Sequence, residues 1–230
     1  MLHPMNFLIS IEGDEFTGKT TVAVPAIARF FEKKEFVVQT SREPGGSEKG
    51  EAMRREIFEK LRQGTSPYDQ AVLFNEARRV HINEVIRPFF AQDDRKVLVL
   101  DRYLDSTRIY QGFEGNVPFE KLFELEKKYV GSFFPQITVI LYFPDNVIET
   151  AIQNRKPAAI KERKRRNEVI PFDTVTLQKH IQRQHNHLQL PLIAKRNNEH
   201  RDFVVVDASG SPDEVAHLIT QNLAGVRLLV

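Results

Sequence analysis

The feature that most constrains this chain is a glycine-rich loop that directly follows a short apolar run. The loop fits the pattern G-x-x-x-x-G-K-[ST] and comprises Gly13, Asp14, Glu15, Phe16, Thr17, Gly18, Lys19 and Thr20. Glycines let a backbone close around an anion and point several N–H groups inward, and a helix that begins there adds the positive end of its dipole. The lysine brings a positive charge to the outer phosphates, and the threonine hydroxyl is a ligand for Mg²⁺. The pattern therefore predicts a strand, a phosphate-binding loop and a helix.

Apolar runs alternate with longer amphipathic stretches along the rest of the chain, and no internal repeat is present. The expected strands are residues 7–11, 36–40, 97–100, 137–143 and 203–206, and the expected helices are residues 19–33, 49–61, 69–87, 118–129, 147–155, 173–195 and 212–223. Nearly continuous apolar strands are typical of a parallel sheet that is covered on both faces. We therefore expect an α/β fold of the P-loop NTPase type, with five parallel strands flanked by helices.

Prolines mark two of the expected helices. Ser211 is a plausible N-cap for the last helix, with Pro212 at its first position. Pro25 falls inside the helix that follows the phosphate loop, where a proline removes a hydrogen bond and costs roughly 3 kcal/mol. We therefore expect a kink or a late helix start near Pro25.

The composition describes a globular chain. Its 230 residues are 41% hydrophobic and include no cysteine, which excludes disulfides, thiolate metal sites and a catalytic thiol. The sequence shows neither an apolar run long enough to cross a membrane nor the regions of a signal peptide, so we expect no membrane contact and a cytoplasmic protein. The net charge of only +2 does not indicate wholesale nucleic-acid binding.

Charged residues follow the second and third expected strands. Ligands of open parallel sheets bind at the carboxyl ends of the strands, which places Arg42 and Asp101 close to the phosphate loop. An aspartate at that position suits direct or water-mediated Mg²⁺ binding, and Arg102 can bind a phosphate with two hydrogen bonds. Residues 105–112 add several hydrogen-bonding side chains beside them.

The expected helix 69–87 holds Phe74 and Arg78, which share one face because they are four residues apart. An aromatic ring beside a guanidinium can stack on a planar base and bind its edge. A core phenylalanine beside a surface arginine is the alternative, and the spacing alone favours it. For His81 we expect a capped or exposed side chain rather than a ligand.

A basic run at residues 161–166 has two interpretations. It is either a patch for nucleic acid or a targeting receptor, or an arginine-bearing lid that closes over transferring phosphates. Because the same chain carries a phosphate loop, we favour the lid.

Taken together, these motifs resemble the thymidylate kinase family, which phosphorylates dTMP to dTDP with ATP. The family pattern E-G-x-D-G-x-G-K-T-T resembles residues 12–21, T-R-E-P-G-G-T followed by G-E-x-x-R resembles residues 41–47 with Gly50, Glu51 and Arg54, and L-F-A-A-D-R-A-Q-H resembles residues 73–81. The pattern D-R-Y-x-x-S-S-x-A-Y-Q-G is nearly complete at residues 101–112, and an I-D-A pattern before a final helix recurs at residues 206–208. The likeness covers most of the chain.

The resemblance implies a single kinase domain over residues 1–230 with a lid at about 156–171, the substrates ATP and dTMP, Mg²⁺, and a homodimer formed through the long helices. It places ATP at residues 13–21, including Thr21, and Mg²⁺ beside Thr20 and Asp101. The dTMP site would comprise Glu15, Arg42, Pro44, Phe74, Arg78, Arg102, Ser106, Thr107, Tyr110 and Gln111. Among these residues, Phe74 would stack on thymine, Arg78 would bind its carbonyl edge, and Tyr110 would fill the space of a ribose 2′-hydroxyl.

The chain departs from the family pattern in the loop and in the lid. Glu15 stands where the family has the aspartate that binds the sugar 3′-hydroxyl, and Phe16 stands where some members carry a catalytic arginine. The catalytic groups would then be Lys19 and Arg102 together with lid arginines. Arg166 is our first choice, because it lies two residues before Glu168 as in the family's D-R-x-E, and Arg163 is the second.

Two other functions remain open from the sequence. One is a kinase for another deoxynucleoside monophosphate or for a deoxynucleoside. The other is a non-catalytic nucleotide-binding relative that contacts nucleic acid through residues 161–166, against which the intact Lys19, Asp101 and Arg102 argue.

Overall fold

One parallel sheet forms the centre of the molecule. The computed structural model describes residues 6–91, 95–165 and 175–226, and within these ranges all side chains but those of residues 162–165. Its five strands lie in the order β2-β3-β1-β4-β5, and each neighbouring pair is parallel. The strands are β1 Phe7–Gly13, β2 Val37–Arg42, β3 Lys96–Asp101, β4 Ile137–Tyr142 and β5 Asp202–Asp207. The predicted five-stranded parallel sheet is confirmed.

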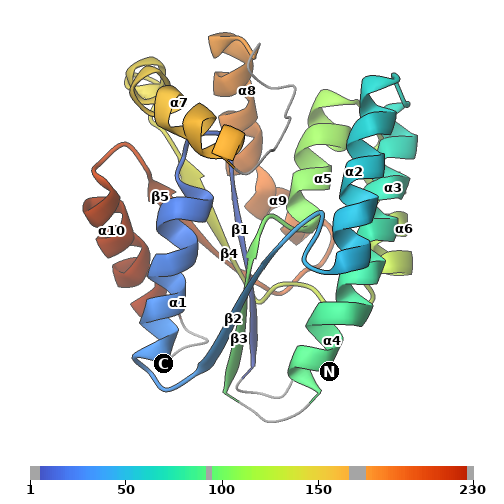
Figure 1. Cartoon of the computed structure of the whole chain (residues 1–230), viewed down its shortest axis with the longest axis horizontal. Helices are drawn as coiled ribbons and strands as arrows, with labels where there is room; N and C mark the ends of the chain where they lie inside the picture. The colour runs from blue at the N-terminus through green and yellow to red at the C-terminus, as the bar shows by residue number, and fades with distance from the viewer. Residues whose placement is uncertain (1–5, 92–94, 166–174, 227–230) are drawn as a thin grey trace.

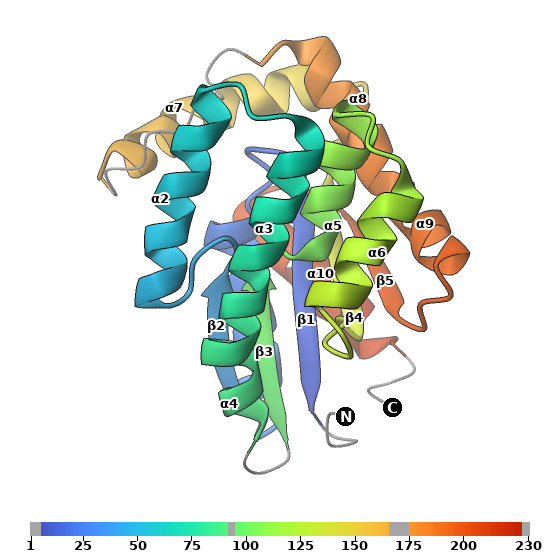
Figure 2. The same ribbon diagram turned by 90° about the vertical axis from the view of Figure 1, so that its right-hand side faces the viewer.

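Helices connect the strands and cover both faces of the sheet (Figure 1). In chain order they are η1 Lys19–Ala23, α1 Val24–Glu32, α2 Glu48–Arg62, α3 Pro67–His81, η2 Ile82–Ile86, α4 Arg87–Phe90, α5 Leu104–Thr107, η3 Arg108–Glu114, α6 Phe119–Tyr129, α7 Ile148–Arg165, α8 Leu177–Leu188, α9 Leu190–Arg196 and α10 Pro212–Ala224, where η marks π-helical hydrogen bonding. Figure 2 shows α7 and α8 above the end of the sheet at which the strands finish.

The two faces of β1 explain its unbroken apolar sequence. Phe7, Ile9 and Ile11 point to one face and pack in a core with residues of α1 and α10. Leu8 points to the opposite face and packs with residues of η2, α5 and β3. Every residue of β1 is buried because helices cover both sides.

Charged side chains are buried together on the second face, where α5, η3 and α6 meet the loop that precedes β5. Arg108 is fully buried and pairs with Glu126 and Glu199, while Arg201 binds Asp105 at 2.5 and 2.7 Å. Buried charges of this kind persist only when each is paired. The pairs fix α5 and η3, which carry the polar residues that follow β3.

Pro25 and Pro88 each follow a π-helical turn. The N–H of Val24 donates to the carbonyl of Lys19 just before Pro25, and the N–H of Arg87 donates to the carbonyl of Ile82 just before Pro88. The wider turn moves a carbonyl away from the proline ring, which relieves the clash. The late start of regular α-helix near Pro25 is therefore confirmed.

Two predicted helix boundaries are wrong. The helix expected at 147–155 continues as α7 to Arg165, because the residues beyond Arg155 are rich in alanine, lysine, glutamate and arginine, which outweigh Pro157. The helix expected at 173–195 divides at Gln189 into α8 and α9, since Pro191 cannot donate a hydrogen bond to the preceding turn.

The predicted start of the last helix is confirmed. The Ser211 hydroxyl accepts a hydrogen bond from the Glu214 backbone, and the Glu214 carboxylate accepts one from the Ser211 backbone, which forms a capping box with Pro212 in the first turn.

Candidate active site

A cleft of about 870 Å³ lies at the carboxyl ends of β1, β2 and β3. Arg42 and Asp101 are register partners at the ends of β2 and β3, so the segments that follow both strands start at the same edge. Most of the predicted site residues line this cleft: Glu15, Phe16, Thr17, Gly18, Lys19, Thr20, Thr21, Arg42, Pro44, Phe74, Arg78, Asp101, Arg102, Ser106, Thr107, Tyr110 and Gln111. Residues far apart in the sequence thus form one site.

The phosphate loop closes on itself through local contacts. A Cβ on Gly13 would lie 2.5 Å from the carbonyl oxygen of Leu141, and Gly18 adopts a left-handed conformation with φ 89° at the start of η1. The Thr17 hydroxyl and the Lys19 ammonium both donate to the carbonyl of Asp14, at 2.8 and 2.6 Å. These bonds hold the loop in its turn and keep the lysine beside it.

The surroundings of Lys19 destabilise its protonated form. Burial lowers the pKa of the Lys19 ammonium to about 8, Arg102 adds to the effect, and Asp101 opposes it. An anion in the cleft would raise this pKa again, because an opposite charge favours the protonated amine. The ammonium is therefore suited to binding phosphate oxygens.

The two predicted metal ligands lie against each other. The Thr20 hydroxyl donates a hydrogen bond to the Asp101 carboxylate. Mg²⁺ takes few protein oxygens and keeps several waters and phosphate oxygens, so this pair fits its chemistry. No group of three or more histidine, aspartate or glutamate side chains in the described ranges could hold a metal on its own.

Arg102 takes a backbone conformation that is rare for a side-chain-bearing residue, with φ 70°. Its backbone N–H donates to Ile11 at 3.0 Å, and its guanidinium donates to the Ser106 hydroxyl at 3.1 Å. The buried Glu12 carboxylate lies 3.9 Å from this guanidinium and accepts a bond from Ser106. Burial raises the pKa of Glu12 to about 7, although Arg102 opposes the shift. The loop after β3 is thus fixed to β1.

Arg42 lies at the mouth of the cleft and is partly exposed. Its guanidinium binds the carboxylate of Glu51 on α2 at 3.1 and 3.2 Å. Arg54, which is also on α2, donates to the carbonyl of Pro44 at 2.9 Å. Burial alone would raise the pKa of Glu51, but the hydrogen bonds and charge of Arg42 hold it below its ordinary value. The motif that follows β2 therefore ties this loop to α2.

Arg78 is buried, with 3% of its surface exposed, so the interpretation as a surface arginine is wrong. Its guanidinium donates to the Glu43 carboxylate at 2.7 Å, to Asn75 at 2.9 Å and to the Thr107 hydroxyl at 3.3 Å. Phe74 lines the cleft one turn earlier on α3 and is half-buried rather than a core residue. The orientation of the arginine is therefore determined by partners in three different segments.

His81 is also buried, which corrects the expectation of a capped or exposed side chain. One ring nitrogen contacts the second oxygen of Glu43 at 2.8 Å, and the other contacts the Ser41 hydroxyl at 2.8 Å. Buried polar groups need such partners. Glu43 thus joins α3 to the end of β2 through both Arg78 and His81.

Tyr110 and Gln111 lie on η3, which packs against α3, and both line the cleft. The guanidinium carbons of Arg102 and Arg183 lie 5.4 and 5.0 Å from the centre of the Tyr110 ring. Burial raises the pKa of the Tyr110 hydroxyl to about 12, although Arg102 opposes the shift. Gln111 donates a hydrogen bond to Gln70 on α3 at 3.1 Å.

Helix α8 contacts the phosphate loop at Asp14. His180 contacts the Asp14 carboxylate at 2.5 Å, and Arg183 lies 3.7 Å from its second oxygen while pairing with Glu114. Burial would raise the pKa of Asp14, but the hydrogen bond and charge of His180 hold it below its ordinary value. Asp14 therefore meets α8, and neither Asp14 nor Gly13 lines the cleft.

The sequence reasoning missed several residues of this site. Glu43, Gln70, Glu114, Lys179 and Arg183 all line the cleft. Gln70 could have been found, because it lies four residues before Phe74 on the same helix face. Nothing local marks Arg183, which reaches the site only through the packing of α8.

The two predicted lid arginines are Arg163 and Arg166. Arg163 falls in the last turn of α7, not in a segment between helices as expected, and its side chain is outside the described part of the chain. Arg166 lies outside the described residues. Arg155 earlier on α7 lines the cleft and donates to the carbonyls of Phe16, Ala208 and Gly210 at 3.3, 2.6 and 2.8 Å.

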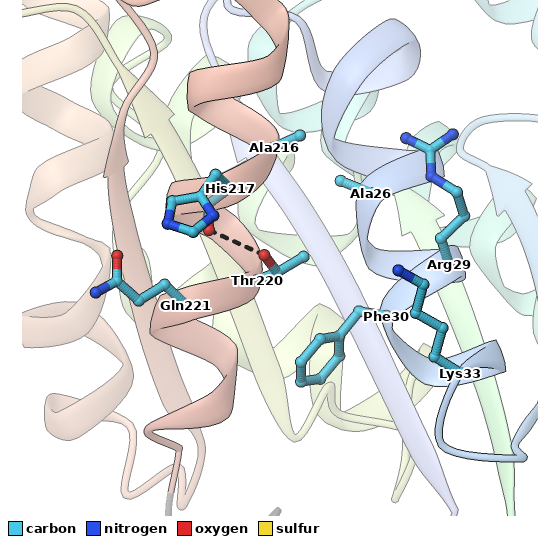
Figure 3. A pocket seen from close by; sticks show the side chains of 8 residues that line it. All are labelled: Ala26, Arg29, Phe30, Lys33, Ala216, His217, Thr220 and Gln221. Atoms are coloured by element: carbon cyan, nitrogen blue, oxygen red, sulfur yellow. Dashed lines mark hydrogen bonds between the residues drawn. The ribbon is translucent and has the colours of Figure 1, made fainter.

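A second hollow of about 510 Å³ lies between α1 and α10, and Figure 3 shows its side chains. Arg29 lies on α1 and Lys33 directly follows it. His217 and Thr220 lie on α10, where the Thr220 hydroxyl donates to the carbonyl of His217. Both cations are exposed, and none of the described polar residues that line the hollow is buried. The large cleft is therefore the candidate active site.

A phosphate loop after β1, with charged residues at the ends of the next two strands in the same cleft, defines a P-loop nucleotide-binding protein of the kinase class. The family model for thymidylate kinase matches residues 11–219. The chain belongs to the thymidylate kinase family.

Relatives of the chain are named thymidylate kinase. It is 32% identical to a thymidylate kinase of Bartonella quintana over 93% of this chain and 92% of the relative. It is 30% identical to one of Syntrophotalea carbinolica over 94% of each chain. A crystal structure of thymidylate kinase from Ehrlichia chaffeensis has the same fold, with a TM-score of 0.66, 23% identity, and coverage of 95% of this chain and 98% of that chain. None of the described helices combines the length and the apolar character needed to span a membrane.

Proposed function

We propose that this chain transfers the γ-phosphoryl group of ATP to dTMP, which gives dTDP and ADP. The observation that carries the proposal is the single cleft, which has the phosphate loop and Lys19 at one end and Phe74, Arg78 and Gln111 at the other. One end suits a polyphosphate and the other suits a flat base with a polar edge. Membership of the thymidylate kinase family supports the same reaction.

At the phosphate end, the loop amides and Lys19 would hold the β- and γ-phosphates of ATP. Thr20 and Asp101 would hold Mg²⁺, which neutralises phosphate charge when it is bound. Arg42 and Arg102 would hold the phosphate of dTMP and position its oxygen in line with the γ-phosphorus. Lys19 and Arg102 would then offset the charge that spreads over the transferring group.

At the nucleoside end, Phe74 would stack on thymine and Arg78 would bind its carbonyl edge. Glu15 would contact the sugar 3′-hydroxyl, and Tyr110 would exclude a 2′-hydroxyl. The remaining contacts to the nucleotide are assigned to Pro44, Ser106, Thr107 and Gln111, all of which line the cleft.

The lid would supply the cation that the phosphate loop lacks at Phe16. We assign this role first to Arg166 and second to Arg163, within a lid at about 156–171 of one kinase domain. Closure of such a lid also keeps water from the phosphoryl group. Arg166→Ala should lower kcat roughly a thousandfold with little change in dTMP binding, and Arg163→Ala should do less. Equal and small effects of both changes and of Lys164→Ala would assign the run to a solvated surface.

The function is tested by ADP production from ATP in the presence of dTMP, dUMP, dCMP or dGMP. We expect dTMP to be the best acceptor and Lys19→Ala to abolish the signal. Equal rates with every acceptor, or ADP release that does not depend on an acceptor, would contradict the proposal.

We also propose that the chain acts as a homodimer in the cytoplasm. The long helices α2, α3 and α6 pack side by side on one flank of the molecule, which offers a regular surface to a second copy. Sedimentation equilibrium at micromolar concentration would test the dimer, and a concentration-independent monomer would contradict it.

A further inference from the structure

Gln70 takes part in a chain of hydrogen bonds that ends at the nucleoside side of the cleft. The Gln70 side-chain N–H donates to the backbone carbonyl of Thr65 at 2.8 Å. The Gln111 side-chain N–H donates to the Gln70 side-chain oxygen at 3.1 Å. Both glutamines line the cleft, and Gln111 is buried. Two amides are therefore linked in series between a loop carbonyl and the candidate base site.

The direction of this chain is fixed by its first member. A backbone carbonyl only accepts hydrogen bonds, so Gln70 must turn its NH₂ group toward Thr65. The Gln70 oxygen then faces Gln111, which must turn its own NH₂ group toward Gln70. The oxygen of Gln111 is left on the opposite side, and it accepts no hydrogen bond from any side chain or backbone group in the described residues.

The loop that supplies the carbonyl is itself held in place. The Thr65 hydroxyl donates to the carbonyl of Lys60 at 2.7 Å, and the Thr65 backbone N–H donates to the same carbonyl at 3.3 Å. The next residue, Ser66, caps α3. The carbonyl of Thr65 therefore has little freedom to turn away, and the orientation passes along both amides.

We propose that Gln70 is a positioning residue that sets base selectivity by fixing the side-chain oxygen of Gln111 as a hydrogen-bond acceptor. The matching ligand is a pyrimidine that has an N–H at N3 and a carbonyl at C4, as thymine and uracil have. Cytosine has an unprotonated N3 and an amino group at C4, so its N3 would face the oxygen of Gln111 and its amino group would face the guanidinium of Arg78. The inference rests on the proposed phosphorylation of dTMP and adds the residue that decides against dCMP.

Selectivity for dTMP over dCMP is the readout, because a loss of general packing would lower both activities together. In Gln70→Leu, Gln111 can turn over, and the ratio of kcat/KM for dTMP to that for dCMP should fall about tenfold or more, mainly through KM. Gln70→Glu keeps an acceptor for Gln111 but cannot donate to Thr65. It should therefore keep the ratio of the parent within about threefold while it lowers the melting temperature.

The control is Gln63→Leu, which makes the same change at an exposed glutamine that bonds Glu59 and does not line the cleft. It should leave the ratio unchanged. If Gln70→Leu does not fold, Gln70→Ala replaces it with the same expected ratio.

An unchanged ratio in the folded Leu or Ala variant, or a ratio lost equally in Gln70→Glu, would overturn the role of Gln70. In that case the parent still phosphorylates dTMP, and the proposed function stands. A parent enzyme that does not phosphorylate dTMP would overturn both, so the two failures are distinguishable.

Discussion

The phosphate end and the nucleoside end of the cleft are built in different ways. At the phosphate end, one continuous loop supplies the turn, the inward-facing backbone and the lysine, and Thr17 and Lys19 both bond the carbonyl of Asp14 within that loop. At the nucleoside end, Arg78 takes its orientation from Glu43, Asn75 and Thr107, which belong to three separate segments.

This difference predicts which property a substitution at each end will change. A local loop keeps its shape when a single side chain is removed, so changes there should affect the chemistry rather than the fold. A buried network is interdependent, and the loss of one partner leaves other charged or polar groups unpaired. Changes at the nucleoside end should therefore affect stability and selectivity.

The largest effect is expected for Lys19→Ala. It should lower kcat about a thousandfold or more, because the ammonium acts on the transferring phosphate, and it should leave the melting temperature close to that of the parent. Steady-state ADP production and thermal unfolding measure the two effects. Lys33→Ala, at the exposed residue that follows α1, is the matched control. Activity of Lys19→Ala within tenfold of the parent would contradict the assignment.

Glu43→Ala should instead damage the fold. It leaves the buried Arg78 without its carboxylate and removes a partner of His81, and we expect a loss of about 3 kcal/mol in the free energy of unfolding. Denaturant unfolding measures this loss. Glu56→Ala removes a glutamate from a surface pair with Lys60 and should change stability little. If the two variants unfold alike, the network is not interdependent.

Tyr110→Ala should alter selectivity for the sugar. If the ring fills the space of a 2′-hydroxyl, its removal should reduce the preference for dTMP over the ribose form of the same nucleotide by about tenfold. Tyr110→Phe keeps the ring and should keep the preference. Competition between the two nucleotides gives both ratios directly. Should the alanine variant discriminate as well as the parent, sugar selectivity lies elsewhere in the cleft.

The last effect is gradual with pH and concerns Glu12, which is buried in β1 and accepts hydrogen bonds from Tyr103 and Ser106. Burial raises the pKa of its carboxyl to about 7, so the folded protein binds this proton more tightly than the unfolded chain does. Its contribution to stability is fully present below the unfolded pKa of 4.5 and is lost as the pH rises through about 7. The resulting slope is at most about 1.4 kcal/mol per pH unit.

Glu12→Gln removes this titration. A plot of unfolding free energy against pH should therefore be flatter for the variant than for the parent across the range from about 4.5 to 7. Parallel plots would show that Glu12 titrates alike in the folded and unfolded states.

The sequence alone determined the sheet and the phosphate end. Unbroken apolar strands that alternate with helices indicate a parallel sheet that is covered on both faces. The eight residues from Gly13 to Thr20 form a pattern that predicts the conformation of the phosphate loop. The placement of Arg42, Asp101 and Arg102 followed as well, because the carboxyl ends of neighbouring parallel strands share an edge. In each case the information lies within a few consecutive residues.

Tertiary structure decided what depends on contacts between distant segments. The sequence could not show that Arg78 and His81 on α3 are buried. Their common partner is Glu43, which lies in the loop that follows β2. It could not show that α8 holds Asp14, nor that the direction of the Gln111 amide is set by the carbonyl of Thr65. Hydrogen bonds and burial depend on distance in space, and spacing along a chain gives that distance only within one helix, strand or loop.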